Sequence, residues 1–250
     1  MRFPRPLVPA RFIRRVNRFA ALVEVDGRPE QVHVRNSGRL HELLRAGRQV
    51  LLLPAETPER RTRFTLAVVR LPGRYVSVDA HLPNFLVADA LGRRAIAGLR
   101  GYNIVRREPA IGRHRADFLL AQGKQLCLVE VKSVTLVKEG IALFPDAPTL
   151  RGRAHLEHLI AARRRGLDAA ILFVVQRKDA RAFAPNRNAD PGFAESLLRA
   201  SRGGVCIRAI TCHVTPRDVR LARILPVLLD HRASRLGERE KQLTPCCAAD

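Results

Sequence analysis

The sequence is poor in aromatic and in acidic residues. It has no tryptophan and two tyrosines among 250 residues, and aromatic side chains make up 5% of the total. Aspartate and glutamate number 23 against 45 arginines and lysines, which leaves a formal net charge of +22. So large a basic excess predicts a polyanionic partner, and nucleic acid is the leading candidate.

Long apolar runs are also missing. The longest near the middle of the chain, Ala169 to Val175, has seven residues, whereas a membrane-spanning helix needs about 20. Charges and prolines interrupt the first twenty residues, which argues against a signal peptide. We therefore expect a cytoplasmic protein with no membrane partner.

Cysteine is scarce and shows no pattern. The five cysteines are odd in number and include no CxxC pair, so the sequence supports neither a disulfide framework nor a zinc ribbon. Cys206, Cys212 and His213 lie close in sequence, but a fourth zinc ligand is not evident, and buried structural thiols are the favoured interpretation. This usage fits a reducing cytosol.

Hydrophobic residues make up 46% of the chain, which is enough for folded cores, and its first third is rich in short strands. Strands are predicted at 20–25, 31–34, 50–54, 64–70 and 75–79, with a hairpin at Asp26-Gly27 and a short helix from Ser37 to Gly47. This pattern indicates an OB-like β-barrel over residues 1–84. Such barrels often bind single strands through basic and aromatic groups, but we expect most of the few aromatics here to lie in the core: Phe12, Phe19, Phe64 and Tyr75.

From residue 85 onward, helices alternate with strands. Helices are predicted at 85–99, 153–165 and 191–201, strands at 116–120, 125–135, 169–176 and 205–215, and a link at 101–107. This alternation is typical of an α/β core, which we place at residues 85–230. The polar segment 231–250 is predicted to be a flexible tail.

The strongest chemical signal is Asp117 followed, across a short hairpin, by Glu130-Val131-Lys132. Side chains two residues apart in a strand share a face, so Glu130 and Lys132 project together while Val131 turns the other way. A turn at 122–124 can bring Asp117 beside Glu130. Two carboxylates suit Mg²⁺ or Mn²⁺, and a lysine beside the metal can orient the attacking water and offset charge on a phosphoryl group. The pattern therefore predicts a metal-dependent nuclease site.

An ordinary solvated pair on a sheet edge is the alternative, since the E-x-K spacing alone is weak evidence. Two details favour the site. The apolar residues 126–129 imply a largely buried strand, where carboxylates are costly unless paired or metal-bound. In addition, only 5 of the 45 basic residues are lysines, so this chain keeps lysine where a compact ammonium with an adjustable pKa is useful.

Over roughly residues 12–227 the chain resembles the sugar fermentation stimulation protein A (SfsA) family. The residues that carry the resemblance are Arg15-Val16-Asn17-Arg18-Phe19, Asn36-Ser37-Gly38-Arg39-Leu40, Leu82-Pro83-Asn84, Gly101-Tyr102, Ala116-Asp117-Phe118, Glu130-Val131-Lys132-Ser133-Val134-Thr135-Leu136 and Phe144-Pro145-Asp146-Ala147. The resemblance implies an N-terminal OB-like domain, then an α/β domain like the PD-(D/E)xK restriction endonucleases, in a DNA-binding protein linked to regulation of maltose metabolism.

Transferred to this sequence, the family's nuclease-like core falls on Asp117, Glu130 and Lys132. Glu108 lies where that fold often supplies a further carboxylate near the metal, although a surface acid paired with Arg106 or Arg107 is the alternative. Gln176 matches a polar residue that some related nucleases place beside the site, and a simple strand-end amide is equally consistent. One departure is Leu150, which stands where the family usually has glutamate.

The sequence thus predicts a DNA-binding protein with a magnesium- or manganese-dependent nuclease site at Asp117, Glu130 and Lys132, with Glu108 as a further metal ligand. The candidates for contact with nucleic acid are Arg15, Arg18, Arg39, Arg113, Arg115, Arg151 and His155. The main rival is a transcriptional regulator that keeps the nuclease shape without turnover. RNA as the substrate and a homodimeric state stay open.

Overall fold

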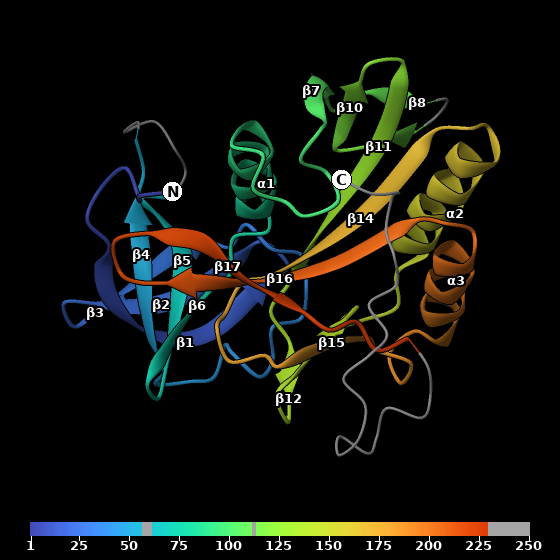
Figure 1. Cartoon of the computed structure of the whole chain (residues 1–250). Coiled ribbons are helices and arrows are strands. Elements are labelled where there is room, and N and C mark those ends of the chain that lie inside the picture. The colour runs from blue at the N-terminus through green and yellow to red at the C-terminus, as the bar shows by residue number, and fades with distance from the viewer. Residues whose placement is uncertain (57–61, 112–113, 230–250) are drawn as a thin grey trace.

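The computed structural model describes residues 1–56, 62–111 and 114–229, and Figure 1 shows a β-barrel beside a sheet flanked by helices. The predicted residue Arg113 and the predicted tail 231–250 lie outside the described residues. No helix in the described part of the chain is long and apolar enough to cross a bilayer.

The first six strands form the barrel. They are β1 (Val8–Asn17), β2 (Ala20–Val25), β3 (Arg28–His33), β4 (Gln49–Pro54), β5 (Phe64–Leu71) and β6 (Arg74–Ser77), in the order β3-β2-β1-β4-β5-β6. A parallel bridge between His33 and Thr65 joins β3 to β5 and closes a five-stranded ring. The inward side chains are aliphatic apart from Phe12 and are almost fully buried. The predicted barrel is confirmed.

The barrel's turns follow the sequence in one place and depart from it in another. Asp26 and Gly27 both have positive φ, 50° and 75°, as the two-residue turn of a tight hairpin requires, so the predicted hairpin is present. The predicted helix from Ser37 to Gly47 is wrong. Leu40 has φ 53°, which no right-handed helix accommodates, and its carbonyl instead accepts the turn hydrogen bonds of the next residues.

A mixed six-stranded sheet forms the second part of the chain, in the order β17-β16-β14-β11-β10-β7. Its strands are β7 (Asn103–Arg107), β10 (Phe118–Gln122), β11 (Gln125–Val134), β14 (Asp168–Val175), β16 (Cys206–Val214) and β17 (Val219–Leu225). The three central strands, β11, β14 and β16, are parallel. Every residue of β14 after Asp168 is buried, as expected for a central strand covered on both faces.

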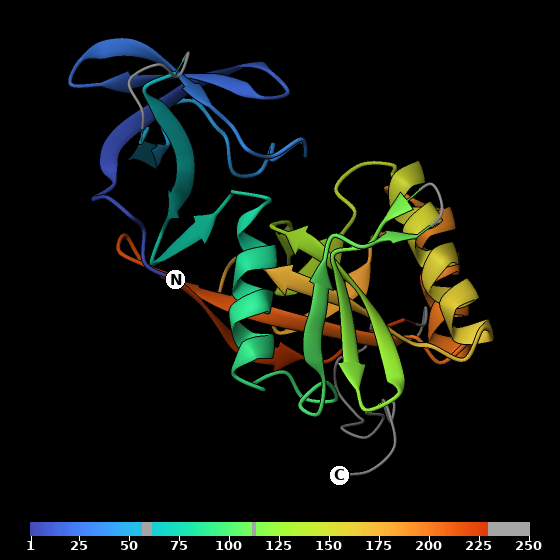
Figure 2. The same ribbon diagram turned by 90° about the horizontal axis from the view of Figure 1, so that it is seen from above.

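Helices cover both faces of this sheet, as Figure 2 shows from above. Helix α1 (Leu82–Gly92) packs on the face nearer the barrel, and α2 (Leu150–Arg164) with α3 (Pro191–Arg202) packs on the other. The predicted helix over 85–99 is therefore shifted toward the N-terminus, and the predicted link at 101–107 contains strand β7.

Smaller elements complete the fold. Strands β12 (Val137–Lys138), β13 (Ile141–Phe144) and β15 (Ala182–Pro185) form a three-stranded sheet, and β8 (Ala110–Ile111) pairs with β9 (His114–Arg115). The N-terminal residues cross to the second part of the chain, where Phe3 donates a backbone hydrogen bond to Arg217 at 3.0 Å. The barrel and the α/β domain are thus fixed to one another, while the division after residue 84 stays a prediction.

Candidate active site

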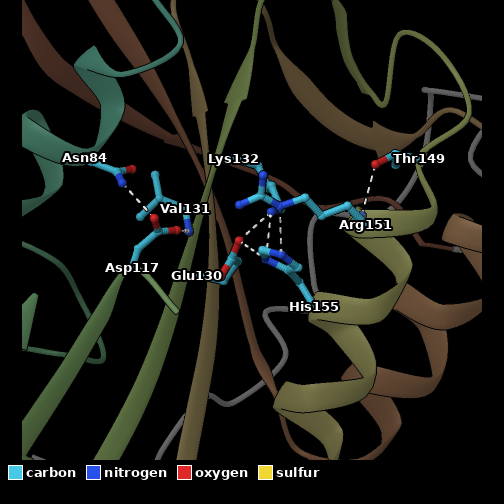
Figure 3. Close-up of polar contacts among 9 residues, drawn as sticks. Asn84, Asp117, Glu130, Val131, Lys132, Thr149, Arg151 and His155 are labelled. Atoms are coloured by element: carbon cyan, nitrogen blue, oxygen red, sulfur yellow. Dashed lines mark hydrogen bonds and ion pairs between the residues drawn. The ribbon is translucent and has the colours of Figure 1, made fainter. Parts of the chain in front are cut away.

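Asp117 is held by three separate segments of the chain. It directly precedes β10, and its backbone carbonyl accepts a hydrogen bond from Glu108 N at 2.9 Å. Its Oδ2 accepts from the backbone N–H of Val131 at 2.7 Å, and its Oδ1 accepts from Asn84 Nδ2 of helix α1, also at 2.7 Å. Figure 3 shows the carboxylate between these two donors. The predicted hairpin between β10 and β11 therefore brings Asp117 to the residue that separates Glu130 from Lys132.

Glu130 and Lys132 share the α2 face of β11, as the strand pleat predicts. Lys132 Nζ donates to Glu130 Oε1 at 2.5 Å, with 14% of the lysine side chain and 6% of the glutamate side chain exposed. This is a buried ion pair, so the solvated pair of the alternative interpretation is excluded for these two residues.

His155 and Arg151 reach the same cluster from helix α2. They are four residues apart and lie on one face of the helix, where Arg151 Nε donates to His155 Nε2 at 3.2 Å. Because Nε2 is then the acceptor, the imidazole carries its hydrogen on Nδ1, and that N–H donates to Glu130 Oε1 (Figure 3). The N-terminus of α2 is fixed by Thr149, whose hydroxyl accepts from Gly152 N at 3.0 Å.

The two carboxylates differ in electrostatic environment. Burial raises the pKa of Asp117, the negative charge of Glu130 raises it further, and the N–H donors from Val131 and Asn84 offset only part of the shift. Burial acts in the same direction on Glu130, but the hydrogen bond from His155 and the charge of Lys132 outweigh it and lower the pKa of Glu130. Asp117 is therefore the carboxylate that protonates more readily, and Glu130 the one that the protein holds in its charged form.

Gln176 joins the barrel to strand β11. It is fully buried at the end of β14, where its Nε2 donates to the carbonyl of Asp79 at 3.0 Å and to Ser133 Oγ at 2.9 Å. The backbone carbonyl of Gln176 accepts a hydrogen bond from Ser77 N at 3.1 Å. Ser133 points to the face opposite Lys132, so Gln176 lies behind the strand rather than beside Glu130.

The remaining predicted residues lie around the cluster. Glu108 is exposed, with φ 49°, and its ion-pair partner is Arg115 at 3.8 Å rather than Arg106 or Arg107. Its side chain has no recorded contact with Asp117 or Glu130, and its role as a metal ligand stays a prediction.

Arg15 differs from the other predicted arginines because its guanidinium is committed within the barrel. Its five N–H groups donate to five backbone carbonyls, those of Asn17, Arg18, Asn36, Gly38 and Arg39. Arg18, Arg39 and Arg151 are exposed, although Arg151 also donates to His155. Contact of any of these residues with nucleic acid stays a prediction.

One residue with a place in this site was not among the predicted site residues. Asn84 holds Asp117 through its side-chain amide. Asn84 lies in a segment that carries the family resemblance, which is the only signal in the sequence that marks it. Nothing in local periodicity links Asn84 to a carboxylate 33 positions later.

Comparisons with known proteins agree with this architecture. The model of the N-terminal OB domain of SfsA matches residues 13–78, and that of the sugar fermentation stimulation protein RE domain matches residues 81–218. A sugar fermentation stimulation protein homolog from Caldanaerobacter subterraneus subsp. tengcongensis is 40% identical over 224 residues, which cover 90% of this chain and 98% of the relative. The homolog from Chloroflexus aggregans is 44% identical over 224 residues, which cover 90% of this chain and 86% of the relative.

A solved structure is similar over almost the same span. It is described as Pyrococcus furiosus SfsA in complex with Ca²⁺, and it superposes with a TM-score of 0.84 at 32% identity, covering 91% of this chain and 99% of that one. Both domain models and these relatives identify the same family. The chain therefore belongs to the sugar fermentation stimulation protein family.

Proposed function

We propose that this protein is a metal-dependent nuclease that binds DNA and hydrolyses its phosphodiester bonds. The observation that carries the proposal is that the half-buried Asp117, directly before β10, bonds to the backbone of β11 beside the buried Glu130, with Lys132 on the same face as Glu130. Placing these charges in a buried site is costly unless they serve a ligand.

The donor set fits a hard divalent cation. Asp117 and Glu130 offer carboxylate oxygens, and burial together with the charge of Glu130 raises the pKa of Asp117, an effect that a positive charge between the two carboxylates would relieve. Within the described ranges no three His, Cys, Asp or Glu side chains converge as in an all-protein cage. A partly hydrated Mg²⁺ or Mn²⁺ suits such a site, because these ions keep waters for exchange with phosphate oxygens. The Ca²⁺ in the Pyrococcus furiosus relative supports this choice of ion type.

The side chains of the site have separable roles. When bound, the metal would supply Lewis-acid activation of the phosphoryl group and of water. Lys132 orients the water and neutralises charge on the phosphoryl oxygens. His155, held by Arg151, fixes the orientation of Glu130 through its Nδ1–H, which makes it a positioning residue.

The basic surface supports binding to nucleic acid. Arg18, Arg39, Arg115 and Arg151 are exposed and can contact phosphates, while the net charge of +22 attracts a polyanion at longer range. We place the binding barrel at residues 1–84 and the nuclease domain at 85–230, in a protein that acts in the cytoplasm.

A regulator without turnover is the second candidate, and one observation favours it. Glu130 Oε1 is bound by both Lys132 and His155, so this oxygen is already neutralised by the protein itself. If this arrangement persists with DNA bound, the site holds no metal and the fold serves binding alone.

The test is cleavage of end-labelled single- and double-stranded DNA and RNA with Mg²⁺ or Mn²⁺, and with EDTA. Wild-type protein is compared with Asp117→Ala, purified identically. Metal-dependent cleavage that disappears in Asp117→Ala, with binding retained, supports the nuclease. Binding to DNA without cleavage under every condition supports the regulator.

A further inference from the structure

The hairpin between β1 and β2 exposes apolar side chains where a barrel normally hides them. The described residues include nine exposed large apolar side chains. Three of these belong to a seven-residue stretch of this hairpin: Ile13, Val16 and Phe19. Phe19 is 52% exposed, whereas Phe12 on the same hairpin is 3% exposed and fills the core. The expectation that most aromatics of the barrel lie in the core is confirmed by Phe12, Phe64 and Tyr75, and Phe19 is the exception.

The exposed phenylalanine lies among positive charges. Arg14 and Arg18 are exposed on the same hairpin, and the chain has no acidic residue before Glu24. A patch that combines an aromatic face with guanidinium groups matches the chemistry of a nucleobase attached to a phosphate backbone. A second copy of this chain is a poor occupant, because the two hairpins would bring their arginines together.

The hairpin is rigid around Phe19. The backbone N–H of Phe19 donates to Asn17 Oδ1 at 2.8 Å, and its carbonyl accepts from Val34 N, also at 2.8 Å. Arg15 adds its bonds to the carbonyls of Asn17 and Arg18 in the turn itself. An aromatic ring on a fixed backbone loses little conformational entropy when a base stacks on it.

A continuous series of contacts fixes this hairpin relative to the active site. Arg15 also donates to the carbonyls of Asn36 and Gly38, both at 2.7 Å. Gly38 packs so closely on the α/β domain that a Cβ there would lie 2.7 Å from Asp146 Oδ2. Asp146 directly precedes the turn into α2, which carries His155. Direct contacts therefore connect the hairpin to the segment that leads into α2.

We propose that Phe19 is a stacking platform for an unpaired nucleobase, and that the site accordingly takes single-stranded nucleic acid or a substrate with an unpaired segment. The inference rests on the proposed function for its link to cleavage, but the stacking can be measured without it. In the interior of a duplex both faces of each base are covered by its neighbours and only the two end pairs expose a face, so a lone exposed ring gains stacking mainly from bases outside a helix.

The absence of tryptophan from this chain makes the contact directly observable. Phe19→Trp introduces a single tryptophan, whose fluorescence is quenched when a base stacks on it. Leu126→Trp is the matched control, because Leu126 is also exposed, at 38%, but lies on β11 of the α/β domain rather than on the hairpin of the barrel. Both variants are titrated in EDTA at fixed salt with one oligonucleotide, as a single strand of DNA, a single strand of RNA, and a blunt duplex.

The proposal expects quenching of Phe19→Trp by single strands and not by the duplex, with Leu126→Trp unchanged. Measured by anisotropy, Phe19→Ala weakens single-strand binding about 10- to 100-fold, and Phe19→Trp restores it. Phe19→Leu keeps the apolar surface without the ring and stays weak.

Several results overturn the proposal. These are equal quenching of both tryptophan variants, full affinity in Phe19→Leu, an equal loss for duplex and single strand in Phe19→Ala, or a dimer in wild type that Phe19→Ala dissociates. Because metal is absent, stacking without any later cleavage contradicts the nuclease alone, and cleavage with no effect at Phe19 contradicts the stacking alone.

Discussion

The hydrogen bonds of Arg15 allow the loss of stability on its substitution to be estimated. A lysine at this position keeps the charge, but its single nitrogen does not extend to the places of Nη1 and Nη2, which bind the carbonyls of Gly38 and Asn36. The bonds to Asn36 and Gly38 are partly buried and the other three are exposed, where water replaces a lost donor at little cost. Two partly buried carbonyls at about 1 to 1.5 kcal/mol each give a destabilisation of roughly 2 to 3 kcal/mol for Arg15→Lys.

Thermal and urea unfolding measure this loss. For a protein of this size a destabilisation of roughly 2 to 3 kcal/mol lowers Tm by about 5 to 10 °C. Arg14→Lys, which alters an exposed arginine on the same strand, is the control and should leave Tm almost unchanged. An Arg15→Lys protein with wild-type stability and weakened DNA binding would show that Arg15 contacts the nucleic acid and that its five bonds contribute little to folding.

Three further predictions concern single side chains. Asn84→Ala should raise the pKa of Asp117, because it removes a charge-assisted hydrogen bond. It should also weaken Mn²⁺ binding about 10-fold in calorimetric titration, and unchanged metal affinity would contradict a positioning role for Asn84. Burial acts to raise the pKa of Asp190, but Arg153 and backbone N–H donors hold this pKa below its ordinary value. The Asp190 carboxylate therefore stabilises the fold fully above about pH 4, and this stabilisation is lost as pH falls through the pKa of the folded state. The difference in unfolding free energy between wild type and Asp190→Asn should therefore be constant near neutrality and shrink in acid, and a difference that grows in acid would contradict the assignment. Gly38→Val should separate the barrel from the α/β domain locally and lower Tm, because its Cβ would overlap the carboxylate of Asp146. Gly47→Ala is the control, since its Cβ meets no neighbour and the variant tests backbone strain alone.

Local pattern in the sequence was sufficient for the elements whose periodicity is regular. The hairpin at Asp26-Gly27, the buried strand β14 and the shared face of Glu130 and Lys132 follow from turn chemistry and strand pleat. Strand β1 was missed because its arginines mask the inward residues and because two register shifts, between Phe12 and Arg14 and again near Asn17, break the two-residue period.

The contacts within the site that local sequence pattern did not predict depend on long-range packing. His155 reaches Glu130 across 25 positions because α2 returns over the sheet, and Asn84 reaches Asp117 because α1 packs on its opposite face. The short helix predicted before Gly47 failed for a tertiary reason as well, since bonds from Arg15 and Asn36 hold that segment in an open loop. Propensity alone carries no information about such partners.

The most direct test of the nuclease assignment is the single-turnover cleavage rate of Lys132→Ala, at protein concentrations that saturate binding and with saturating Mn²⁺. Lys138→Ala, which alters an exposed lysine on β12, is the matched control for loss of one positive charge. The account predicts that Lys132→Ala retains binding and loses about 100- to 1,000-fold in rate, while Lys138→Ala cleaves as wild type does. Equal rates for the two variants, or no metal-dependent cleavage by wild type on any DNA or RNA, would contradict it.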